Sequence, residues 1–379
     1  MAKKLGFGCM RLPLLNGDDQ TSFDMELICE MVDTFLERGF TYFDTAYVYH
    51  GSKSEIAVRE ALVKRHRRDE FTLATKLPPR MLTAVEDQDR IFAEQLEKCG
   101  VDFFDYYLVH NIGVSSYEQA CKFDTFGFVQ QKKREGKIRK AGMSFHDTPE
   151  LLDEVLTAHP ELDFVQLQIN YVDWDNPGIQ SRRCYEVARK HGMPIVVMEP
   201  VKGGNLAVIP PAAEALMKAY DAEATVASWA VRYAASLDDV FMVLSGMSNR
   251  EQVVDNTSYM IDFKPLSDEE RAIIDQVVEI INSDSAIACT TCRYCEKGCP
   301  QNIAIPDYFA LYNNAKRATT KGISSQFVYY QNLTSTHGKA SDCIDCKQCE
   351  AACPQHLAIT ESLNDVALAF ETVKLPSSK

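Results

Sequence analysis

Short apolar runs rich in β-branched residues alternate with longer amphipathic stretches from the start of the chain to about residue 246. Such runs suit buried strands and such stretches suit helices, so the alternation indicates repeated βα units in an α/β fold. Eight strands are predicted: Leu5–Met10, Thr41–Ala46, Phe71–Lys76, Tyr106–His110, Ala141–Phe145, Phe164–Ile169, Ile195–Glu199 and Phe241–Ser245. Eight such units close into a (β/α)8 TIM barrel, whose active site lies at the C-terminal ends of the strands.

Helices are predicted between the strands, over residues 22–38, 52–65, 84–98, 123–137, 149–158, 180–190 and 225–235. Glycine often closes a helix because it adopts the left-handed backbone conformation without strain. Four glycines stand where a predicted helix gives way to the next strand: Gly39, Gly100, Gly136 and Gly192. These glycines support the predicted helix ends.

Beyond the last strand, helices are predicted over residues 250–256 and 265–281, the second with Ser267 as N-cap and Glu270 in the capping-box position. Residues 282–285 are polar and predict a linker. We therefore divide the chain into a TIM barrel, residues 1–282, and a smaller, mostly helical domain, residues 283–379. Further helices are predicted in the second domain, over 306–316 and 366–373.

The composition is that of a globular protein with room for two or three domains in 379 residues. Its 40 basic against 54 acidic residues give a net charge of -14, which disfavours nucleic acid and anionic membranes as partners. No apolar run is long enough for a signal peptide or a membrane span, so we expect a cytoplasmic protein. Scattered cysteines fit reduced thiols in that compartment: Cys9, Cys29, Cys99, Cys121 and Cys184.

Eight further cysteines form two runs of the pattern C-x2-C-x2-C-x3-C-P, the second starting 54 residues after the first. Thiolates at these spacings suit 4Fe-4S clusters, in which three cysteines of a run bind one cluster and the fourth reaches the other. The first cluster would be bound by Cys289, Cys292, Cys295 and Cys353. The second would be bound by Cys343, Cys346, Cys349 and Cys299.

Zinc is the alternative, because C-x2-C pairs also form zinc knuckles. Zinc sites usually present two cysteine pairs with a longer spacer, whereas here four thiols crowd into eleven residues twice over. The residues after each run echo one another, 300–305 (PQNIAI) in 354–359 (PQHLAI), and so indicate an internal duplication. The pattern favours two iron-sulfur clusters over zinc.

Four polar residues stand at or just past the ends of consecutive predicted strands: Asp44, Tyr49, Lys76 and His110. A lysine ammonium beside a tyrosine stabilises the phenolate and lowers the phenol pKa, and an aspartate keeps that lysine charged. A histidine across the cavity can hydrogen-bond a carbonyl oxygen, so the set can protonate oxygen while hydride arrives at carbon. Each residue alone has an ordinary structural alternative, as a turn residue, a packing aromatic, a solvated charge or a core histidine.

The segments around these residues, 43–49 (FDTAYVY), 74–76 (ATK) and 108–110 (LVH), resemble the aldo-keto reductase family over residues 1 to about 282. The cysteine domain resembles helical dicluster ferredoxins, and the whole chain resembles the ferredoxin-fused branch of that family. The resemblance implies that Tyr49 is the proton donor, that Lys76 and Asp44 tune it, and that His110 orients the carbonyl.

The family also binds NADPH or NADH over the barrel mouth. By resemblance, the nicotinamide carboxamide would be held by Ser144 and Gln166, and the adenine end by Gln252 and Asn256, with Arg250 as a substitute for the usual phosphate-binding residue. The sequence departs from the family where Phe145 replaces an asparagine and Glu199 an aromatic residue that stacks on nicotinamide. A carboxylate offers no π-face, so one binding contact is missing.

The leading hypothesis is an oxidoreductase that reduces a small-molecule carbonyl, or oxidises the alcohol, while the clusters relay electrons. A cluster moves one electron and nicotinamide moves two as hydride, so either a flavin mediates, the clusters are structural or regulatory, or electrons pass directly to the substrate. An alternative is a nicotinamide-independent enzyme that takes electrons from a ferredoxin or flavodoxin and reduces a quinone or another acceptor. A non-catalytic redox-sensing subunit is the third hypothesis.

Overall fold

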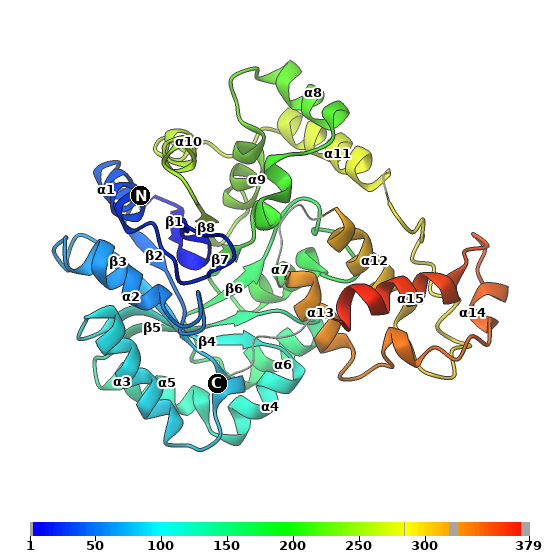
Figure 1. Ribbon diagram of the computed structural model, residues 1–379, viewed down its shortest axis with the longest axis horizontal. Helices are drawn as coiled ribbons and strands as arrows, with labels where there is room; N and C mark the ends of the chain where they lie inside the picture. The colour runs from blue at the N-terminus through cyan, green and yellow to red at the C-terminus, as the bar shows by residue number, and fades with distance from the viewer. Residues whose placement is uncertain (1–2, 284, 318–323, 373–379) are drawn as a thin grey trace.

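A computed structural model describes residues 3–283, 285–317 and 324–372 of the chain (Figure 1). Eight parallel strands pair in chain order and the last pairs with the first, so the sheet is a closed barrel. The strands are β1 (Leu5–Gly8), β2 (Tyr42–Asp44), β3 (Thr72–Leu77), β4 (Phe104–Ile112), β5 (Ile138–Phe145), β6 (Phe164–Gln168), β7 (Ile195–Met198) and β8 (Val240–Gly246). The predicted fold class is confirmed.

The strand ends differ from the predicted ones where local turns or pairing decide them. β1 is shorter than predicted because Cys9–Arg11 forms a 3-10 turn, η1. β4 is longer at both ends because it pairs with β5 from Phe104 to Ile112, past a bulge between Val109 and Ile112. The bulge bends the strand at the barrel mouth, immediately beside His110.

Helices cover the outside of the barrel (Figure 1). Those close to the predicted stretches are α1 (Met25–Glu37), α2 (Ser54–Val58) with its π-helical continuation η2 (Arg59–Val63), α3 (Asp87–Cys99), α5 (Thr125–Arg134), α6 (Pro149–Ala158), α7 (Ser181–Lys190), α9 (Val226–Ala235), α10 (Arg250–Met260) and α11 (Asp268–Ser283). Short 3-10 turns are η3 (Pro79–Met81) and η4 (Lys202–Ala207). Two helices of the barrel part were not predicted, α4 (Val114–Lys122) and α8 (Pro211–Tyr220). Each buries only two residues, Ser116 and Ala120 in α4 and Ala213 and Met217 in α8, so neither has a clear apolar periodicity.

Local helix signals are confirmed. The backbone of Gly39, Gly100, Gly136 and Gly192 is left-handed, with φ between 63° and 78°. The predicted capping box closes the start of α11, since Ser267 N donates to Glu270 Oε2 at 2.7 Å and Glu270 N donates to Ser267 Oγ at 3.2 Å. The predicted linker is corrected, because α11 continues to Ser283 and residue 284 lies outside the described residues.

The barrel interior changes from apolar to polar toward the C-terminal ends of the strands. Its apolar layer contains Tyr42, Ala74, Leu108, Phe164, Val196, Met242 and Leu244. A Cβ on Gly142 would lie 2.6 Å from the Phe164 ring, so glycine there lets that ring fill the interior. Side chains two residues apart share one face of a strand, so polar residues of the mouth continue the same inward faces: Asp44, Lys76, His110 and Gln166.

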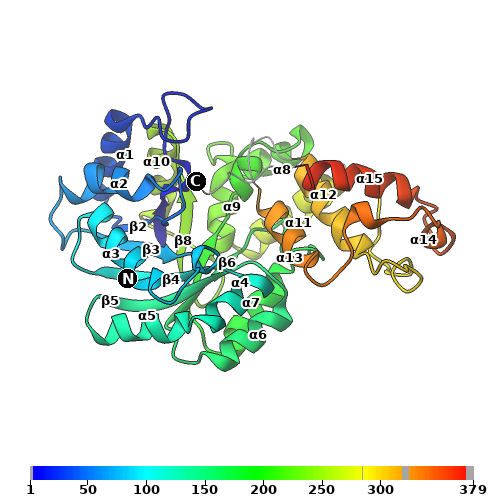
Figure 2. The ribbon, with the colours of Figure 1, turned by 60° about the horizontal axis from the view of Figure 1, so that its bottom comes forward.

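The cysteine-rich part of the chain is mostly helical, as predicted, and lies beside the barrel (Figures 1 and 2). Its elements are α12 (Ile305–Lys316), α13 (Ser325–Leu333), η5 (Ala340–Asp342), α14 (Gln348–Ala351) and α15 (Ile359–Phe370). The predicted helix over 366–373 instead begins at Ile359, and residue 373 lies outside the described residues. In both views α13 lies between the barrel and α15, whereas α14 is farthest from the barrel.

The two cysteine runs repeat one backbone conformation, as the internal duplication requires. Left-handed residues recur 54 positions apart: Thr291 with Asp345, Arg293 with Lys347, and Asn302 with His356. The helix after each run, α12 or α15, begins at the matching isoleucine and has 12 residues. Among the residues that the structure describes, no helix has the length and apolar character to cross a membrane.

Candidate functional site

Lys76 is the centre of the polar set at the barrel mouth. It lies on β3, only 1 % exposed, and its Nζ donates to Asp44 Oδ1 at 2.5 Å and to the Thr45 carbonyl at 2.7 Å. A third contact, at 3.3 Å, joins Nζ to the Tyr49 hydroxyl. Burial opposes the charge of Lys76, but the Asp44 carboxylate and Tyr49 outweigh it and raise the Lys76 pKa. The lysine therefore remains a fixed cation.

Tyr49 differs from the expectation in the direction of its pKa. Burial raises the pKa of its hydroxyl above the ordinary value, and the Lys76 ammonium only partly opposes this shift. The desolvation of the phenol depends on how the whole barrel packs around it, which a pattern along the sequence does not reveal. Tyr49 is therefore protonated at neutral pH and has a proton to donate.

His110 faces Tyr49 across the mouth, with the two rings edge to face and their centroids 5.9 Å apart. Burial lowers the pKa of His110 well below its usual value, and the charges of Lys76, His146 and Arg80 lower it further. The imidazole is consequently neutral. A neutral imidazole can donate one N–H to a carbonyl oxygen without competing with Tyr49 as the acid.

Ser144 and Gln166 are brought together because β5 and β6 pair at these two residues. Ser144 Oγ accepts a hydrogen bond from the backbone N–H of Asn111 at 2.8 Å, which leaves its own proton free to donate. Gln166 Oε1 is buried without a hydrogen-bond partner among the described residues. An unpaired buried amide oxygen is costly, so this pair offers an acceptor and a donor to a bound amide.

The three candidate residues on α10 are placed differently. Asn256 is buried and engaged within the protein, since its Nδ2 donates to Ser245 Oγ at 2.9 Å and its Oδ1 accepts from the Tyr259 hydroxyl at 2.6 Å. Gln252 Oε1 accepts from the backbone N–H of Ser248 at 2.7 Å. Arg250, the first residue of α10, is exposed. Gln252 and Arg250 thus remain accessible to a ligand, while the Asn256 amide is already bonded.

Glu199 places a carboxylate on the Tyr49 side of the mouth. Its backbone is left-handed, with φ 58°, which is uncommon for a residue with a side chain. A carboxylate oxygen lies 3.8 Å from the guanidinium of Arg11, a residue that no sequence signal singled out. Burial raises the pKa of Glu199, with Arg11 and Lys202 opposing the shift.

Helix α13 of the cysteine module contacts the barrel mouth through Asn332. The Asn332 Nδ2 donates to the His146 carbonyl at 2.7 Å, and Arg80 Nη2 donates to Asn332 Oδ1 at 3.0 Å. The ring of Tyr329, one turn earlier, lies 6.0 Å from the His146 ring. A Cβ on Gly113 would lie 2.5 Å from Asn332 Nδ2. A larger residue than glycine at position 113 would therefore clash with the Asn332 side chain. Sequence reasoning missed these contacts, which join residues 186 and 252 positions apart.

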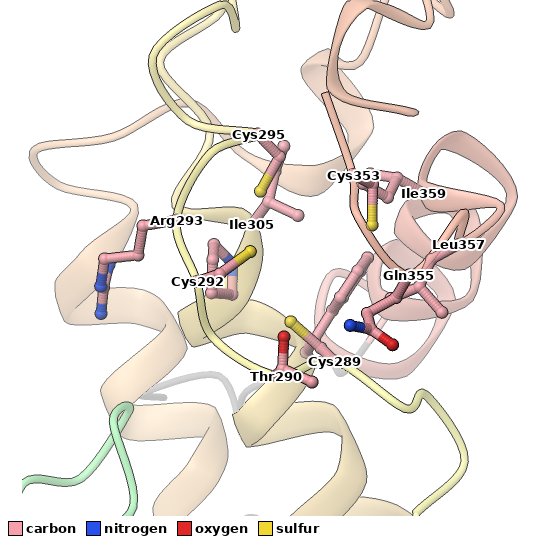
Figure 3. Close-up of a pocket in the computed structure, with 12 residues that line it drawn as sticks. Cys289, Thr290, Cys292, Arg293, Cys295, Ile305, Cys353, Gln355, Leu357 and Ile359 are labelled. Carbon is pink, nitrogen blue, oxygen red and sulfur yellow. The ribbon is translucent and has the colours of Figure 1, made fainter. Parts of the chain in front are cut away.

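The eight clustered cysteines line two separate cavities. The first is walled by Cys289, Cys292, Cys295 and Cys353, together with apolar side chains such as Ile305 and Phe309. Figure 3 shows the four sulfur atoms of this cavity directed toward one common space. The second cavity is walled by Cys299, Cys343, Cys346 and Cys349. The structure therefore brings together the same two groups of four that the spacing predicts.

The cysteine loops are held from outside the cavities. Arg293 belongs to the lining of the first cavity, but its guanidinium is directed away from the sulfur atoms in Figure 3. The guanidinium forms two hydrogen bonds with the Asp307 carboxylate in the first turn of α12, at 2.6 and 2.9 Å. None of the thirteen cysteines, which all lie among the described residues, forms a disulfide. Within the described ranges, no three His, Cys, Asp or Glu side chains lie close enough together to hold a single metal ion.

A closed (β/α)8 barrel with this polar set at its mouth defines a protein of the TIM-barrel class with a candidate active site at the C-terminal ends of its strands. The aldo/keto reductase family model matches residues 4–279, and a 4Fe-4S dicluster domain model matches residues 288–358. The chain belongs to the aldo/keto reductase family and carries a C-terminal 4Fe-4S dicluster domain.

Curated relatives are similar over the barrel. An aldo-keto reductase of Mycolicibacterium vanbaalenii is 30% identical over 240 residues, which cover 63% of this chain and 79% of that protein. The NADH-specific methylglyoxal reductase of Escherichia coli is 24% identical over 327 residues, covering 73% of this chain and 95% of that protein.

Solved structures share the barrel fold. An aldo-keto reductase of Bacillus halodurans in its holo form has a TM-score of 0.57 at 24% identity, covering 72% of this chain and 91% of that one. An aldo-keto reductase of Klebsiella pneumoniae in complex with NADPH has a TM-score of 0.57 at 20% identity, covering 73% and 96%. At these identities the likeness concerns the fold alone.

Proposed function

We propose that this protein reduces a carbonyl compound, or oxidises the corresponding alcohol, at Tyr49, Lys76, Asp44 and His110, and that two 4Fe-4S clusters relay electrons to or from this site. The observation that carries the proposal is the hydrogen-bonded chain from Asp44 through Lys76 to Tyr49, with a neutral His110 on the other side of the mouth. This series of hydrogen bonds is arranged to deliver one proton from Tyr49.

In the reducing direction, the His110 N–H orients the substrate by donating to its carbonyl oxygen. Tyr49 transfers its proton to that oxygen as hydride reaches the carbon and the carbon–oxygen π-bond breaks. The negative charge left on Tyr49 is stabilised by Lys76 Nζ, 3.3 Å away, and Asp44 holds that ammonium in place. The product is the alcohol.

Nicotinamide is the proposed source of the hydride. Ser144 and the unpartnered Gln166 Oε1 fit its carboxamide, which has both an acceptor and a donor. The names of two similar proteins mention NADPH and NADH, so both forms are candidates here. At the adenine end we assign Gln252 and Arg250, with Asn256 in a supporting role because its amide is bonded within the protein.

The two thiol-lined cavities fit 4Fe-4S clusters, because each combines four soft ligands with apolar walls. We assign Cys289, Cys292, Cys295 and Cys353 to one cluster and Cys343, Cys346, Cys349 and Cys299 to the other. We also propose that the cluster domain begins at residue 283, where α11 ends. The contact of α13 with the His146 segment supports a path between this domain and the barrel mouth.

The proton-delivery assignment is tested with Tyr49→Phe and a matched control, Tyr47→Phe. Tyr47 lies two residues earlier, and its hydroxyl donates to Glu94, outside the proposed set. Loss of a general acid costs about 10²- to 10⁴-fold in rate, so Tyr49→Phe should lose turnover with every accepted carbonyl while Tyr47→Phe retains it. Intact turnover in Tyr49→Phe with full iron content would refute the assignment.

A second candidate is a nicotinamide-independent enzyme that takes electrons from a ferredoxin- or flavodoxin-like donor and reduces a quinone or another acceptor. Glu199 favours it, since the family resemblance implies an aromatic residue that stacks on nicotinamide at this position, and a carboxylate offers no π-face. Two clusters holding one electron each supply the two electrons that, with two protons, convert a carbonyl to an alcohol.

These two candidates separate in one titration. Protein purified without oxygen is assayed for iron, sulfide and flavin and then titrated with NADPH while the visible cluster absorbance is followed. Tight, stoichiometric NADPH binding supports the first candidate. Absence of binding, together with cluster bleaching by dithionite and turnover from a reduced ferredoxin, supports the second.

A further inference from the structure

Arg80 lies at the rim of the barrel mouth and has not been given a role above. It belongs to η3, four residues beyond Lys76 along the chain, and its side chain is exposed to solvent. Its Nη2 donates to Asn332 Oδ1 at 3.0 Å and to Ser115 Oγ at 3.3 Å. These acceptors are neutral, so they fix the guanidinium without cancelling its charge.

Arg80 differs in this respect from Lys76. Lys76 is paired with the Asp44 carboxylate, whereas Arg80 has no carboxylate oxygen within 4.0 Å among the described residues. The Asp147 carboxylate interacts with Arg80 electrostatically from a longer distance. Its two oxygens accept hydrogen bonds from the backbone N–H groups of Val114 and Thr148. The positive charge of Arg80 is therefore uncompensated at contact distance.

The charge of Arg80 acts electrostatically on the proposed catalytic residues at the barrel mouth. Arg80 contributes to lowering the pKa of His110, the proposed carbonyl-binding group, and that of His146. Partial desolvation by the surrounding protein lowers the pKa of Arg80 itself, and the charge of Asp147 opposes this shift. An arginine whose charge no contacting carboxylate neutralises is suited to bind a carboxylate or phosphate group with its planar guanidinium.

The guanidinium also retains the donors that such a ligand needs. An arginine has five N–H groups in one plane, and both hydrogen bonds of Arg80 within the described part of the chain use Nη2. The donors on Nε and Nη1 remain for a ligand. Asn332, only 3 % exposed, is itself anchored on the His146 carbonyl and so holds Arg80 in a defined position.

We propose that Arg80 binds an acidic group of the substrate, a carboxylate or a phosphate monoester, while the carbonyl of the same molecule reaches His110 and Tyr49. Arg80 would then determine specificity for acidic carbonyl compounds, and Asn332 would position it from the cluster module. This inference rests on the proposed carbonyl chemistry. The competing role is a clamp, in which Arg80 only holds α13 against the barrel.

The test compares three aldehydes of similar shape: benzaldehyde, 4-carboxybenzaldehyde and 4-formylphenyl phosphate. The readout is the ratio of kcat/KM for each acidic aldehyde to kcat/KM for benzaldehyde. In the wild type at least one ratio should exceed one, and the larger ratio identifies the acidic group. Arg80→Gln should lower that ratio about 10- to 100-fold, mainly through KM, because a hydrogen bond to a charged group contributes about 1.5–3 kcal/mol.

Ser115→Asp separates the binding role from the clamp. It places a carboxylate beside Arg80, near the start of α4, without removing the contact between Arg80 and Asn332. The ratio should fall in this variant as well, whereas the exposed Arg67→Gln control should leave it unchanged. Circular dichroism and iron content confirm that each variant is folded. A ratio at or below one for both acids in the wild type would overturn the proposal, as would a ratio that survives both variants.

Binding distinguishes a failure of this inference from a failure of the proposed function. If the wild type reduces none of the aldehydes, the carbonyl chemistry is refuted, and calorimetry with 4-carboxybenzyl alcohol and benzyl alcohol then decides the role of Arg80. If the wild type binds 4-carboxybenzyl alcohol more tightly than benzyl alcohol, and Arg80→Gln loses this difference, the anion site is supported. Equal binding of the two alcohols by the wild type overturns it.

Discussion

The barrel mouth and the cysteine cavities are organised in opposite ways. In the barrel, Asp44 and Lys76 come from adjacent strands, β2 and β3, and hydrogen bonds already connect them to each other and to Tyr49. In the cysteine module, the thiols come mostly from loops rich in left-handed residues, with Cys349 on α14, and they line two cavities. The barrel site is therefore preorganised by hydrogen bonds, whereas each cavity combines cysteines from the two separate runs.

Each cavity also joins distant segments. Cys353 lies opposite three cysteines of the other run (Figure 3), and Cys299 shares the second cavity with the later run. Clusters bound in this way would cross-link the two halves of the module. Binding would then contribute directly to folding of the module, while the barrel needs no such link.

The largest expected effect concerns the preorganised site. Lys76→Met leaves the buried Asp44 carboxylate without its partner, which should lower the free energy of unfolding by about 3–5 kcal/mol and abolish turnover. Adding Asp44→Asn should restore most of the stability but not the turnover. Urea unfolding measures the first quantity. An unchanged midpoint in Lys76→Met would show that the pair does not stabilise the barrel.

The second prediction concerns the cavities. Cys353→Ser should lose about half of the iron, and the surviving cluster should give the same electron paramagnetic resonance spectrum as in Cys289→Ser. This follows because the two residues line one cavity although they lie in different runs. Cys121→Ser, an exposed thiol on α4, should retain all the iron. If Cys353→Ser instead matched Cys349→Ser, the exchange of fourth cysteines between the runs would be wrong.

A smaller effect is expected where the two regions meet. Asn332→Ala removes the bonds to the His146 carbonyl and to Arg80, which should weaken docking of α13 by about 1–3 kcal/mol. Limited proteolysis should then cut the cysteine module faster while the barrel stays resistant. Gln331→Ala, at an exposed position on the same helix, is the control. Equal cleavage rates in both variants would mean that Asn332 does not hold the regions together.

The last prediction concerns pH. Burial, with help from Arg80 and Lys76, lowers the pKa of His146 to about 4. A depressed pKa stabilises the folded state above the unfolded value of about 6.5, and this stability is lost as pH falls toward 4, by at most about 1.4 kcal/mol per pH unit. His146→Gln should therefore flatten the pH dependence of unfolding in this window, and the exposed His356→Gln should not. An identical slope in all three proteins would contradict the burial of a neutral His146.

The fold was predictable where neighbours along the chain decide it. The strands, the glycine helix ends and the Ser267–Glu270 capping box follow from local patterns, and the cysteine spacing anticipated the grouping in both cavities. Helix α13 was not predictable, because its buried residues include the polar Gln326 and Asn332, which break the apolar periodicity.

The structure brings Asp44, Tyr49, Lys76 and His110 together at the strand ends, as predicted, but the predicted direction of the Tyr49 pKa shift was wrong. Desolvation raises the pKa of Tyr49, and the extent of burial depends on the whole barrel rather than on Lys76 alone. Arg80 and His146 carry no motif, and their contact with Asn332 joins parts of the chain that no local signal relates. A pattern along one sequence does not reveal long-range contacts between single polar residues.

The most direct test of the central claim, that the clusters exchange electrons with the Tyr49 site, is a rapid-mixing experiment without nicotinamide. The protein is reduced with dithionite, and the excess dithionite is removed. It is then mixed with a carbonyl substrate while the cluster absorbance and the alcohol product are measured. The account predicts that the clusters reoxidise as alcohol forms, with about one alcohol for every two cluster electrons, and that Tyr49→Phe loses both signals at unchanged iron content. Clusters that stay reduced while NADPH alone drives full turnover would contradict it.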